Sequence, residues 1–153
     1  MLKESWPGIV DISSKPRLER TATASGRLTL SVNSLQIVRD GGSPKGDVRE
    51  ASSIAAIQAV KETSRILPHC HPIPIEGCSV IWDLEENGLR CTVEVRANWS
   101  TGVEMEALSG VSAGLLCAWD MLKPIEKDEF GQYPEVRIED IRVLVKKKSD
   151  PQG

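Results

Sequence analysis

Runs of apolar residues with two different spacings predict the first two elements of the chain. Between residues 28 and 32, apolar and polar positions alternate, which is typical of a strand with one buried face. Apolar residues at helical spacing follow Asp47, and Asp47 with Glu50 three residues later has the form of an N-terminal cap. We therefore expect a first strand at 28–32 and a helix over 47–66.

Two further alternating runs are joined by a turn signal. Apolar residues alternate with polar ones over 80–84 and again over 89–99. The Asn87-Gly88 pair between the two runs is the strongest short signal for a β-hairpin. The pattern predicts two antiparallel strands with one buried face and one solvated face.

The last third of the chain predicts a second long helix and a final strand. Thr101 and Glu104 have the spacing of a capping box, and apolar residues follow at helical spacing until Pro124, where we expect the helix to end. A strand is expected from about 136 to 145, with a bulge or bend where the alternation slips at Asp140.

The predicted order of strand, helix, strand, strand, helix, strand is that of a ferredoxin-like sandwich. In this α+β fold, two helices pack on one face of an antiparallel sheet. We expect a single domain over 1–153, made of an extended N-terminal arm (1–26), the ferredoxin-like core (27–146) and a flexible tail (147–153).

Composition narrows the class of protein. The chain has 153 residues, of which 40% are hydrophobic, and its formal net charge of −3 argues against broad binding of nucleic acids. Because no segment has the apolar length of a signal peptide or a membrane span, we expect a cytoplasmic protein. In a reducing compartment the four cysteines should be free thiols, with Cys91 and Cys117 in the core.

The segment from Leu67 to Gly77 contains both histidines of the chain and three of its prolines. The prolines stiffen the backbone that displays His69, Cys70 and His71. Two imidazoles and a thiol could bind zinc, or they could lie at the surface of a stiff turn without a role. A group that titrates near neutral pH on a rigid loop could instead bind substrate or transfer protons. The residues alone leave these alternatives open.

Two other clusters have both an ordinary and a functional interpretation. Glu104 and Glu106 lie in a predicted first helical turn, where acidic residues normally complement the helix dipole. Asp120 and Lys123 are three residues apart and share a helix face. They form either a surface ion pair or, in a cleft, a proton donor and acceptor.

Basic residues gather in three stretches of this acidic chain. One stretch precedes the first strand, and one lies near the end of the chain. The third flanks a glycine-rich turn before a helix N-terminus, a place that favours anions. The stretch before the first strand contains Lys15, Arg17, Arg20 and Arg27, and the stretch near the end contains Lys146, Lys147 and Lys148. The glycine-rich turn is flanked by Arg39 and Lys45.

Three segments taken together resemble the cyclic pyranopterin monophosphate synthase family, which acts in molybdenum cofactor biosynthesis. These segments are 67–74, 101–108 and 120–123. Residues 11–15 and 45–48 also match the family's opening and phosphate-side segments. The resemblance runs in order from about residue 10 to 146.

The resemblance implies an enzyme of the lyase class without a cofactor or a metal site. Such an enzyme converts 3′,8-cyclo-7,8-dihydro-GTP into cyclic pyranopterin monophosphate and releases pyrophosphate. The resemblance implies that Asp120 and Lys123 are the catalytic pair, with Lys123 as a general acid or base. The implied substrate-binding residues are His69, Cys70, His71, Glu104, Met105 and Glu106, and the implied phosphate-binding residues are Lys15, Arg20, Lys45 and Lys146. Of the two histidines, His71 is expected to support proton transfer and His69 to line the pocket.

Helix geometry adds an expectation about assembly. If Met105 and Asp120 lie on one straight helix, their fifteen-residue separation corresponds to roughly 22 Å along its axis. One nucleotide-sized substrate cannot reach both, so we expect a pocket formed between chains. The resemblance implies a homohexamer built as a trimer of dimers, with no nucleic-acid or membrane partner.

Three alternative functions remain open at this point. A non-catalytic nucleotide- or pterin-binding module would keep the basic residues but tolerate loss of Lys123. A small ferredoxin-like sensor domain would need neither the histidine segment nor the Asp120–Lys123 pair. A zinc-dependent hydrolase would require a metal at His69 and its neighbours.

Overall fold

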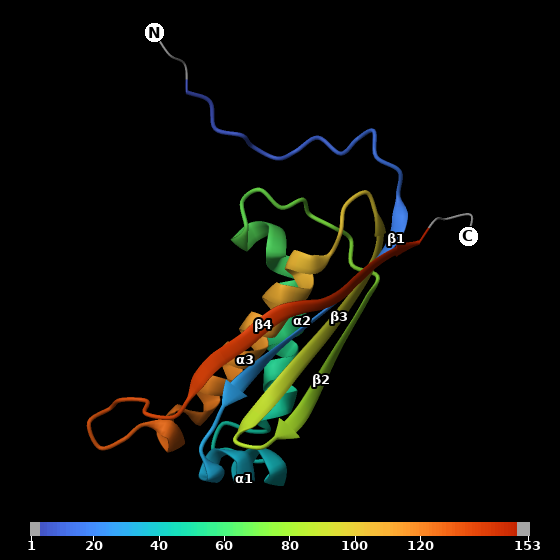
Figure 1. Cartoon of the computed structure of the whole chain (residues 1–153). Helices are drawn as coiled ribbons and strands as arrows, with labels where there is room; N and C mark the ends of the chain where they lie inside the picture. Colours follow the sequence, from blue (N-terminus) through green and yellow to red (C-terminus); the bar gives the residue numbers. More distant parts are fainter. Residues whose placement is uncertain (1–3, 150–153) are drawn as a thin grey trace.

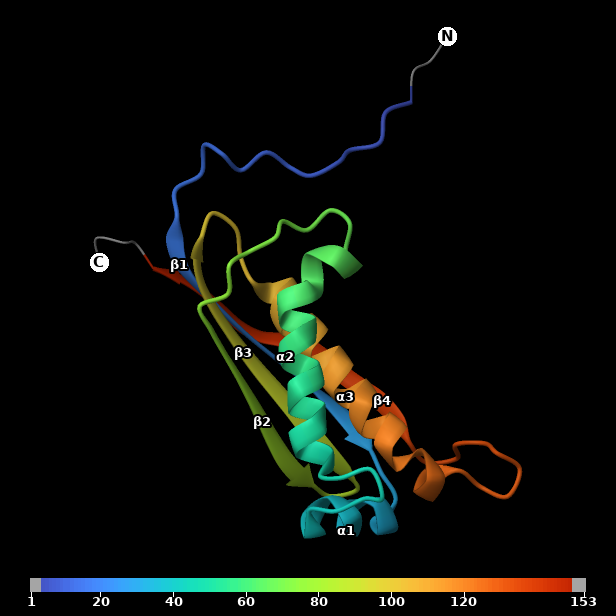
Figure 2. The ribbon, with the colours of Figure 1, turned by 180° about the vertical axis from the view of Figure 1, so that it is seen from behind.

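A four-stranded antiparallel sheet forms the centre of the structure, a computed structural model that describes residues 4–149 (Figure 1). The strands stand in the order β2-β3-β1-β4, and α2 and α3 cover the same face of the sheet (Figure 2). The predicted ferredoxin-like α+β fold is confirmed. The elements are β1 (Leu18–Thr29), α1 (Val32–Asp40), α2 (Val48–Ile66), β2 (Gly77–Glu85), β3 (Gly88–Trp99), α3 (Glu104–Glu126) and β4 (Arg137–Ser149).

The core lies between the sheet and the two long helices. Alternate residues of β1 and β3 point toward the helices and are fully buried, among them Leu28 and Val95. Val111 and Leu115 of α3 are also fully buried in the same cluster. Burial of each such side chain contributes about 1.5–3 kcal/mol. This layer therefore fixes the position of α3, on which several predicted site residues lie.

β1 begins at Leu18, so the predicted arm up to residue 26 and the predicted first strand at 28–32 are wrong in their bounds. The missed part contains small residues such as Ala22 and Gly26, which lack the large apolar side chains of a usual strand signal. They are small because α3 passes close by. A Cβ on Gly26 would lie 2.8 Å from side-chain atoms of α3.

A short helix follows β1 where the sequence pattern predicts that the strand continues through Val32. Ser31 caps this helix by accepting a hydrogen bond from the backbone N–H of Ser34, and Gly41 ends it with a φ of 77°. A serine cap and a left-handed glycine are the usual signals at the two ends of a helix. The α1 helix was therefore detectable from these two residues, although its apolar pattern was ambiguous.

The predicted second helix and hairpin are confirmed. The carboxylate of Asp47 accepts hydrogen bonds from two backbone N–H groups of the first turn of α2, including that of Glu50 at 3.1 Å. In the hairpin, Glu85 of β2 lies opposite Gly88 of β3, and Asn87 in the turn has a φ of 57°. Asparagine tolerates this left-handed conformation better than most residues.

The N-terminal end of α3 differs from the prediction. The cap residue is Val103, which makes no side-chain hydrogen bond to the helix, so the capping box at Thr101 is wrong. The Glu104 carboxylate contacts the ammonium of Lys146 in β4 and also accepts a hydrogen bond from its own backbone N–H. The first turn of α3 is therefore bonded by its own glutamates and not by the cap residue.

The C-terminal end of α3 extends beyond the proline that was expected to stop it. Pro124 lies inside the helix, and the backbone N–H of Lys127 still donates to the carbonyl of Lys123 at 3.0 Å. The buried carboxylate of Glu126 accepts a hydrogen bond from the backbone N–H of Ser31 at 2.8 Å. This contact fixes the end of α3 to the start of α1.

β4 is longer than predicted and runs to Ser149. Lys147 and Lys148 therefore belong to a strand, whereas the remainder of the predicted flexible tail, residues 150–153, lies outside the described residues. The predicted irregularity at Asp140 is confirmed. The register between β1 and β4 shifts between Glu139 and Arg142, which spans Asp140, and again between Val143 and Val145, and Asp140 has a φ of 57°.

The expectation of free thiols is confirmed, because all four cysteines are unpaired. Cys91 is fully buried, and burial raises the pKa of its thiol to about 12. Cys117 is only half-buried at the edge of the core. No helix within residues 4–149 combines the length and the apolar character needed to cross a membrane.

Candidate functional site

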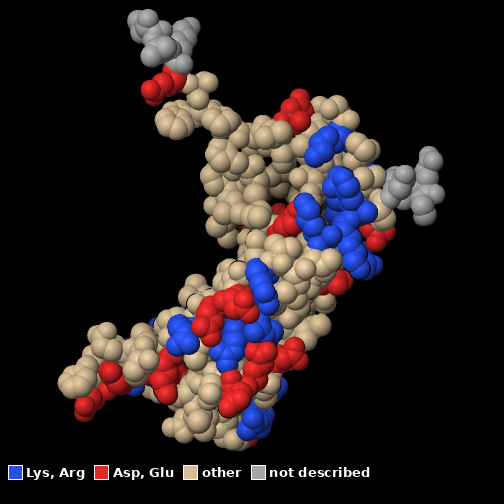
Figure 3. Space-filling view, in the orientation of Figure 1, with Lys and Arg blue, Asp and Glu red and all other residues tan. Residues whose placement is uncertain are grey.

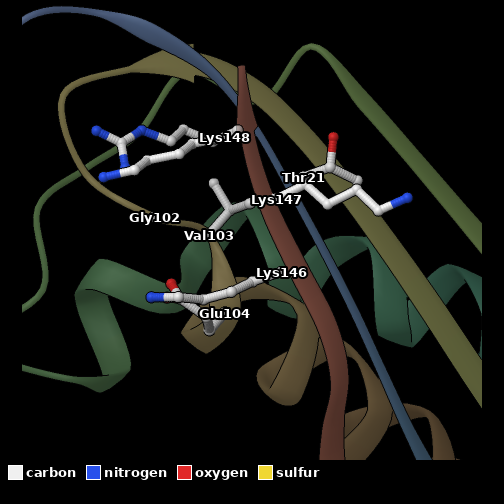
Figure 4. Close-up of a pocket in the computed structure, with 8 residues that line it drawn as sticks. Thr21, Gly102, Val103, Glu104, Lys146, Lys147 and Lys148 are labelled. Carbon is white, nitrogen blue, oxygen red and sulfur yellow. The ribbon is translucent and has the colours of Figure 1, made fainter. Parts of the chain in front are cut away.

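A cavity of about 230 Å³ opens beside the first turn of α3 (Figure 4). Val103 provides no side-chain cap, whereas the carboxylates of Glu104 and Glu106 each accept a hydrogen bond from their own backbone N–H. The helix dipole and the basic side chains around the cavity favour a negatively charged ligand. We name this space the anion cavity. It is lined by Arg20, Thr21, Gly102, Val103, Glu104, Lys146, Lys147 and Lys148.

Basic side chains dominate the wall of the anion cavity. Arg20 of β1 pairs in register with Lys148 of β4, and Lys146 lies two residues before Lys148 on the strand. Lys147 instead points the other way, toward Thr21 (Figure 4). The space-filling view shows Lys and Arg gathered near the end of the chain (Figure 3). Lys148, which is not among the implied phosphate-binding residues, also lines the cavity, because the two-residue period of a strand puts it on the same face as Lys146.

Glu104 stands at the edge of the anion cavity and contacts Lys146. Its carboxylate accepts a hydrogen bond from the Lys146 ammonium at 2.6 Å. Burial opposes ionisation of Glu104, but the hydrogen bond from Lys146 and the charge of Arg20 outweigh it, so the pKa of Glu104 lies below its usual value. Glu104 is therefore a carboxylate at neutral pH that partly neutralises the cavity.

Glu106 and Cys70 form a less polar part of the site next to this cavity. Glu106 is only 3% exposed, and burial raises the pKa of its carboxyl group, with a further contribution from the charge of Glu104. Burial, followed by the charge of Glu106, raises the pKa of the Cys70 thiol. Cys70 is thus a neutral thiol near Glu106, whereas Met105 between the two glutamates is 43% exposed.

The two histidines contact the N-terminal arm. Nδ1–H of His69 donates to the carbonyl oxygen of Gly8, and Nε2–H of His71 donates to that of Val10, each at 2.6 Å. These nitrogens carry hydrogens and present no lone pair to a metal. Among residues 4–149, no group of three or more histidine, cysteine, aspartate or glutamate side chains is placed to hold a metal ion.

Asp120 and Lys123 form an ion pair near the other end of α3. The Lys123 ammonium lies 2.9 Å from one carboxylate oxygen of Asp120, and the Lys45 ammonium lies 3.8 Å from the other. The hydrogen bond with Asp120 raises the pKa of Lys123, and the same bond, with a smaller effect of Lys45, lowers the pKa of Asp120. Both groups are charged at neutral pH, and the raised pKa makes the Lys123 ammonium a weaker acid than a free lysine.

The predicted site residues therefore fall into two groups. Arg20, Glu104, Glu106, Cys70 and Lys146 gather around the start of α3. Asp120, Lys123 and Lys45 lie together toward its end, so Lys45 is separated from the other predicted phosphate ligands. Met105 and Asp120 lie on one continuous helix, at a separation of roughly 22 Å. Lys15 lies on the arm, with an exposed side chain.

An apolar surface lies next to the Asp120–Lys123 pair. Ala113, Leu116, Cys117 and Trp119 line a shallow depression with these two residues, and Leu116 is 61% exposed. Trp119 packs edge-on against Tyr133 of the following loop, with ring centroids 5.4 Å apart. Contiguous apolar residues rimmed by charged ones, as in this depression, are typical of a surface that a partner covers.

The fold and site define a ferredoxin-like α+β protein with an anion cavity at one end of a long helix and a lysine–aspartate ion pair toward the other. The chain belongs to the MoaC family, whose model matches residues 9–149. This confirms the resemblance inferred from the sequence.

Three relatives illustrate the similarity. A protein of Pyrococcus furiosus named probable cyclic pyranopterin monophosphate synthase is 48% identical over 142 residues, covering 93% of this chain and 91% of that protein. A protein of Aeropyrum pernix with the same name is 46% identical over 144 residues, covering 94% of this chain and 99% of that protein. A protein of Methanothermobacter thermautotrophicus, named probable cyclic pyranopterin monophosphate synthase accessory protein, is 48% identical over 140 residues, covering 92% and 88%.

Proposed function

We propose that this protein is a cyclic pyranopterin monophosphate synthase of molybdenum cofactor biosynthesis. It converts 3′,8-cyclo-7,8-dihydro-GTP into cyclic pyranopterin monophosphate and releases pyrophosphate, as a lyase of the cytoplasm. The observation that carries the proposal is the anion cavity beside the buried carboxyl group of Glu106, in a chain of the MoaC family. A ligand with several phosphates and a polar ring system matches this arrangement.

The triphosphate of the substrate binds in the anion cavity. Arg20, Lys146 and Lys148 supply positive charge, and the start of α3 adds the positive end of the helix dipole. Several cations around one leaving group stabilise the charge that develops on pyrophosphate. Lys146 then contacts phosphate oxygens in place of Glu104, and Lys15 approaches from the arm.

Lys123 acts as a general acid in this scheme. Asp120 holds the protonated ammonium in place and raises its pKa, so the lysine gives its proton only to a strongly basic atom that develops during the reaction. Glu106 is a second proton source, because burial raises the pKa of its carboxyl group. Cys70, His71 and Met105 contact the ring system.

The complete pocket forms between two copies of the chain. The roughly 22 Å between Met105 and Asp120 exceeds what one substrate can bridge, so the start of α3 from one copy faces the Asp120–Lys123 pair of another. The apolar depression around Leu116 supplies a surface for that contact. We propose that such dimers assemble further into a homohexamer.

Substitution of Lys123 separates this proposal from a non-catalytic binding module. Lys123→Ala should abolish turnover of 3′,8-cyclo-7,8-dihydro-GTP and leave its binding within a few-fold of the parent. Lys127→Ala, at the exposed residue four positions later that ends α3, is the matched control and should keep normal turnover. Unimpaired turnover in Lys123→Ala, or a requirement for stoichiometric zinc, would contradict the proposal.

A further inference from the structure

The contacts of the two histidines with the arm fix their tautomers. A backbone carbonyl oxygen only accepts hydrogen bonds, so Gly8 requires a hydrogen on Nδ1 of His69 and Val10 requires one on Nε2 of His71. The neutral rings are therefore opposite tautomers. His69 keeps its lone pair on Nε2, and His71 keeps its lone pair on Nδ1.

The two segments match in spacing. The accepting carbonyls of Gly8 and Val10 are two residues apart, as are the donating rings of His69 and His71. Prolines before and after the histidine pair limit the backbone freedom of that loop. Within residues 4–149, no backbone–backbone hydrogen bond joins the arm to the loop, so the imidazoles provide its hydrogen bonds there.

The other end of the arm is fixed to β3. Ser100 donates a hydrogen bond from Oγ to the carbonyl oxygen of Lys15 at 3.0 Å, and the Arg17 guanidinium lies 4.2 Å from the ring centre of Trp99. Residues 8–17, which we name the strap, are thus attached at both ends. They pass over the end of the molecule at which α3 begins (Figures 1 and 2).

We propose that the strap is a positioning element of the site. Its carbonyls at Gly8 and Val10 hold His69 and His71 in opposite tautomers, so that His71 accepts a proton only at Nδ1 and His69 only at Nε2. The strap also carries Lys15, and its docking therefore joins the phosphate side of the site to the ring side. The catalytic consequence rests on the proposed function, whereas the tautomers rest on the hydrogen bonds alone.

The tautomers can be measured directly, because the chain contains only two histidines. Long-range ¹H–¹⁵N spectra of histidine-labelled protein at alkaline pH should show one Nδ1–H ring and one Nε2–H ring. A variant lacking residues 2–5 keeps both carbonyls and should give the same spectrum, whereas one lacking residues 2–10 should give mixed tautomers. Equal spectra for all three proteins, or mixed tautomers in the full chain, would overturn the proposal.

A second variant covers the case in which the shortened chain does not fold. A glycine inserted between Ile9 and Val10 keeps the whole arm but breaks the two-residue spacing, so at least one ring should lose its fixed tautomer. If both rings keep their tautomers in this variant, the strap does not set them. If the strap variants show mixed tautomers but keep the parental turnover number, the strap does not contribute to catalysis. If the full chain shows the expected tautomers but no turnover, the proposed function is wrong, whereas the proposal that the strap sets the tautomers still holds.

Discussion

Glu104 and Glu106 lie two residues apart at the start of α3, and the pKa values of their carboxyl groups move in opposite directions. The Lys146 ammonium overcomes the burial of Glu104 and lowers its pKa, whereas burial raises that of Glu106. One helical turn thus presents a carboxylate and a group that holds its proton more firmly. Such a divergence is a common way to divide acid and base roles in a site.

The two glutamates should have opposite effects on stability. Glu106 has a higher pKa in the folded chain than the usual 4.5, so its ionisation costs stability as pH rises through that value. Glu106→Gln removes this cost and should raise the free energy of unfolding at pH 7. Glu104 has a lowered pKa, so its contribution is present above 4.5 and is lost as pH falls through the folded-state pKa. Glu104→Gln should therefore be destabilising at pH 7.

Urea unfolding at pH 7 and pH 3.5 measures both effects. The difference between each variant and the parent should shrink at pH 3.5, and the two differences should have opposite signs at pH 7. Equal signs at pH 7 would show that the environments of Glu104 and Glu106 are not opposed.

Close packing of β1 against α3 predicts that Gly26 tolerates no side chain. A Cβ at this position would lie within 2.9 Å of three side-chain atoms, from Val111, Leu115 and Ile141. Gly26→Ala should lower the free energy of unfolding by about 1–3 kcal/mol, as overpacking usually does. Gly77→Ala is the control, because its nearest contact would be 3.6 Å from Arg96, and it should be nearly neutral. Thermal unfolding measures the stability of both variants. A melting temperature of Gly26→Ala equal to that of Gly77→Ala would contradict the close packing at Gly26.

Two adjacent serines of α2 should respond in opposite ways to alanine. The Ser52 hydroxyl is buried without a hydrogen-bond partner, so Ser52→Ala should stabilise the protein by about 1 kcal/mol. The Ser53 hydroxyl accepts from Nε1–H of Trp82 at 2.8 Å and donates to the Arg49 carbonyl at 2.7 Å. Ser53→Ala leaves the indole N–H unpaired and should cost about 1–3 kcal/mol. Denaturant titrations that rank the two variants in the reverse order would refute this assignment.

The sequence pattern was sufficient where a local signal and the tertiary packing agree. Asp47 caps α2 and Asn87 turns the hairpin, as residues of these types do in many proteins. β1 was misplaced because its buried face uses Ala22 and Gly26, whose small size reflects the approach of a helix more than eighty residues away in the chain. Such a contact leaves no local signal.

In the candidate site, too, features with a local sequence signal were predictable, and features set by distant contacts were not. Five of the expected residues gather around the start of α3, and Lys148 lies beside them without having been expected there, because the end of β4 was placed earlier. The capping box failed because Glu104 prefers a partner on a distant strand, Lys146. The histidine contacts with the arm were not predictable, since backbone carbonyls carry no residue-specific signal.

Mixing two inactive variants tests whether the pocket lies between chains. If the start of α3 and Lys123 come from different copies, Glu106→Gln and Lys123→Ala each disable every site of their own dimer. A mixed dimer has one intact site, so random exchange of subunits should restore about one quarter of the parental activity. The two variants are refolded together and separately and then assayed at equal concentration. No recovery in the mixture, with the dimer intact by light scattering, would place the whole site in one chain.

Incubation of the purified protein with 3′,8-cyclo-7,8-dihydro-GTP tests the proposed function most directly. Cyclic pyranopterin monophosphate and pyrophosphate should form in equal amounts, Lys127→Ala should keep this activity, and Lys123→Ala should lose it. Binding of the substrate without formation of either product would contradict the assignment as a synthase and leave a binding module.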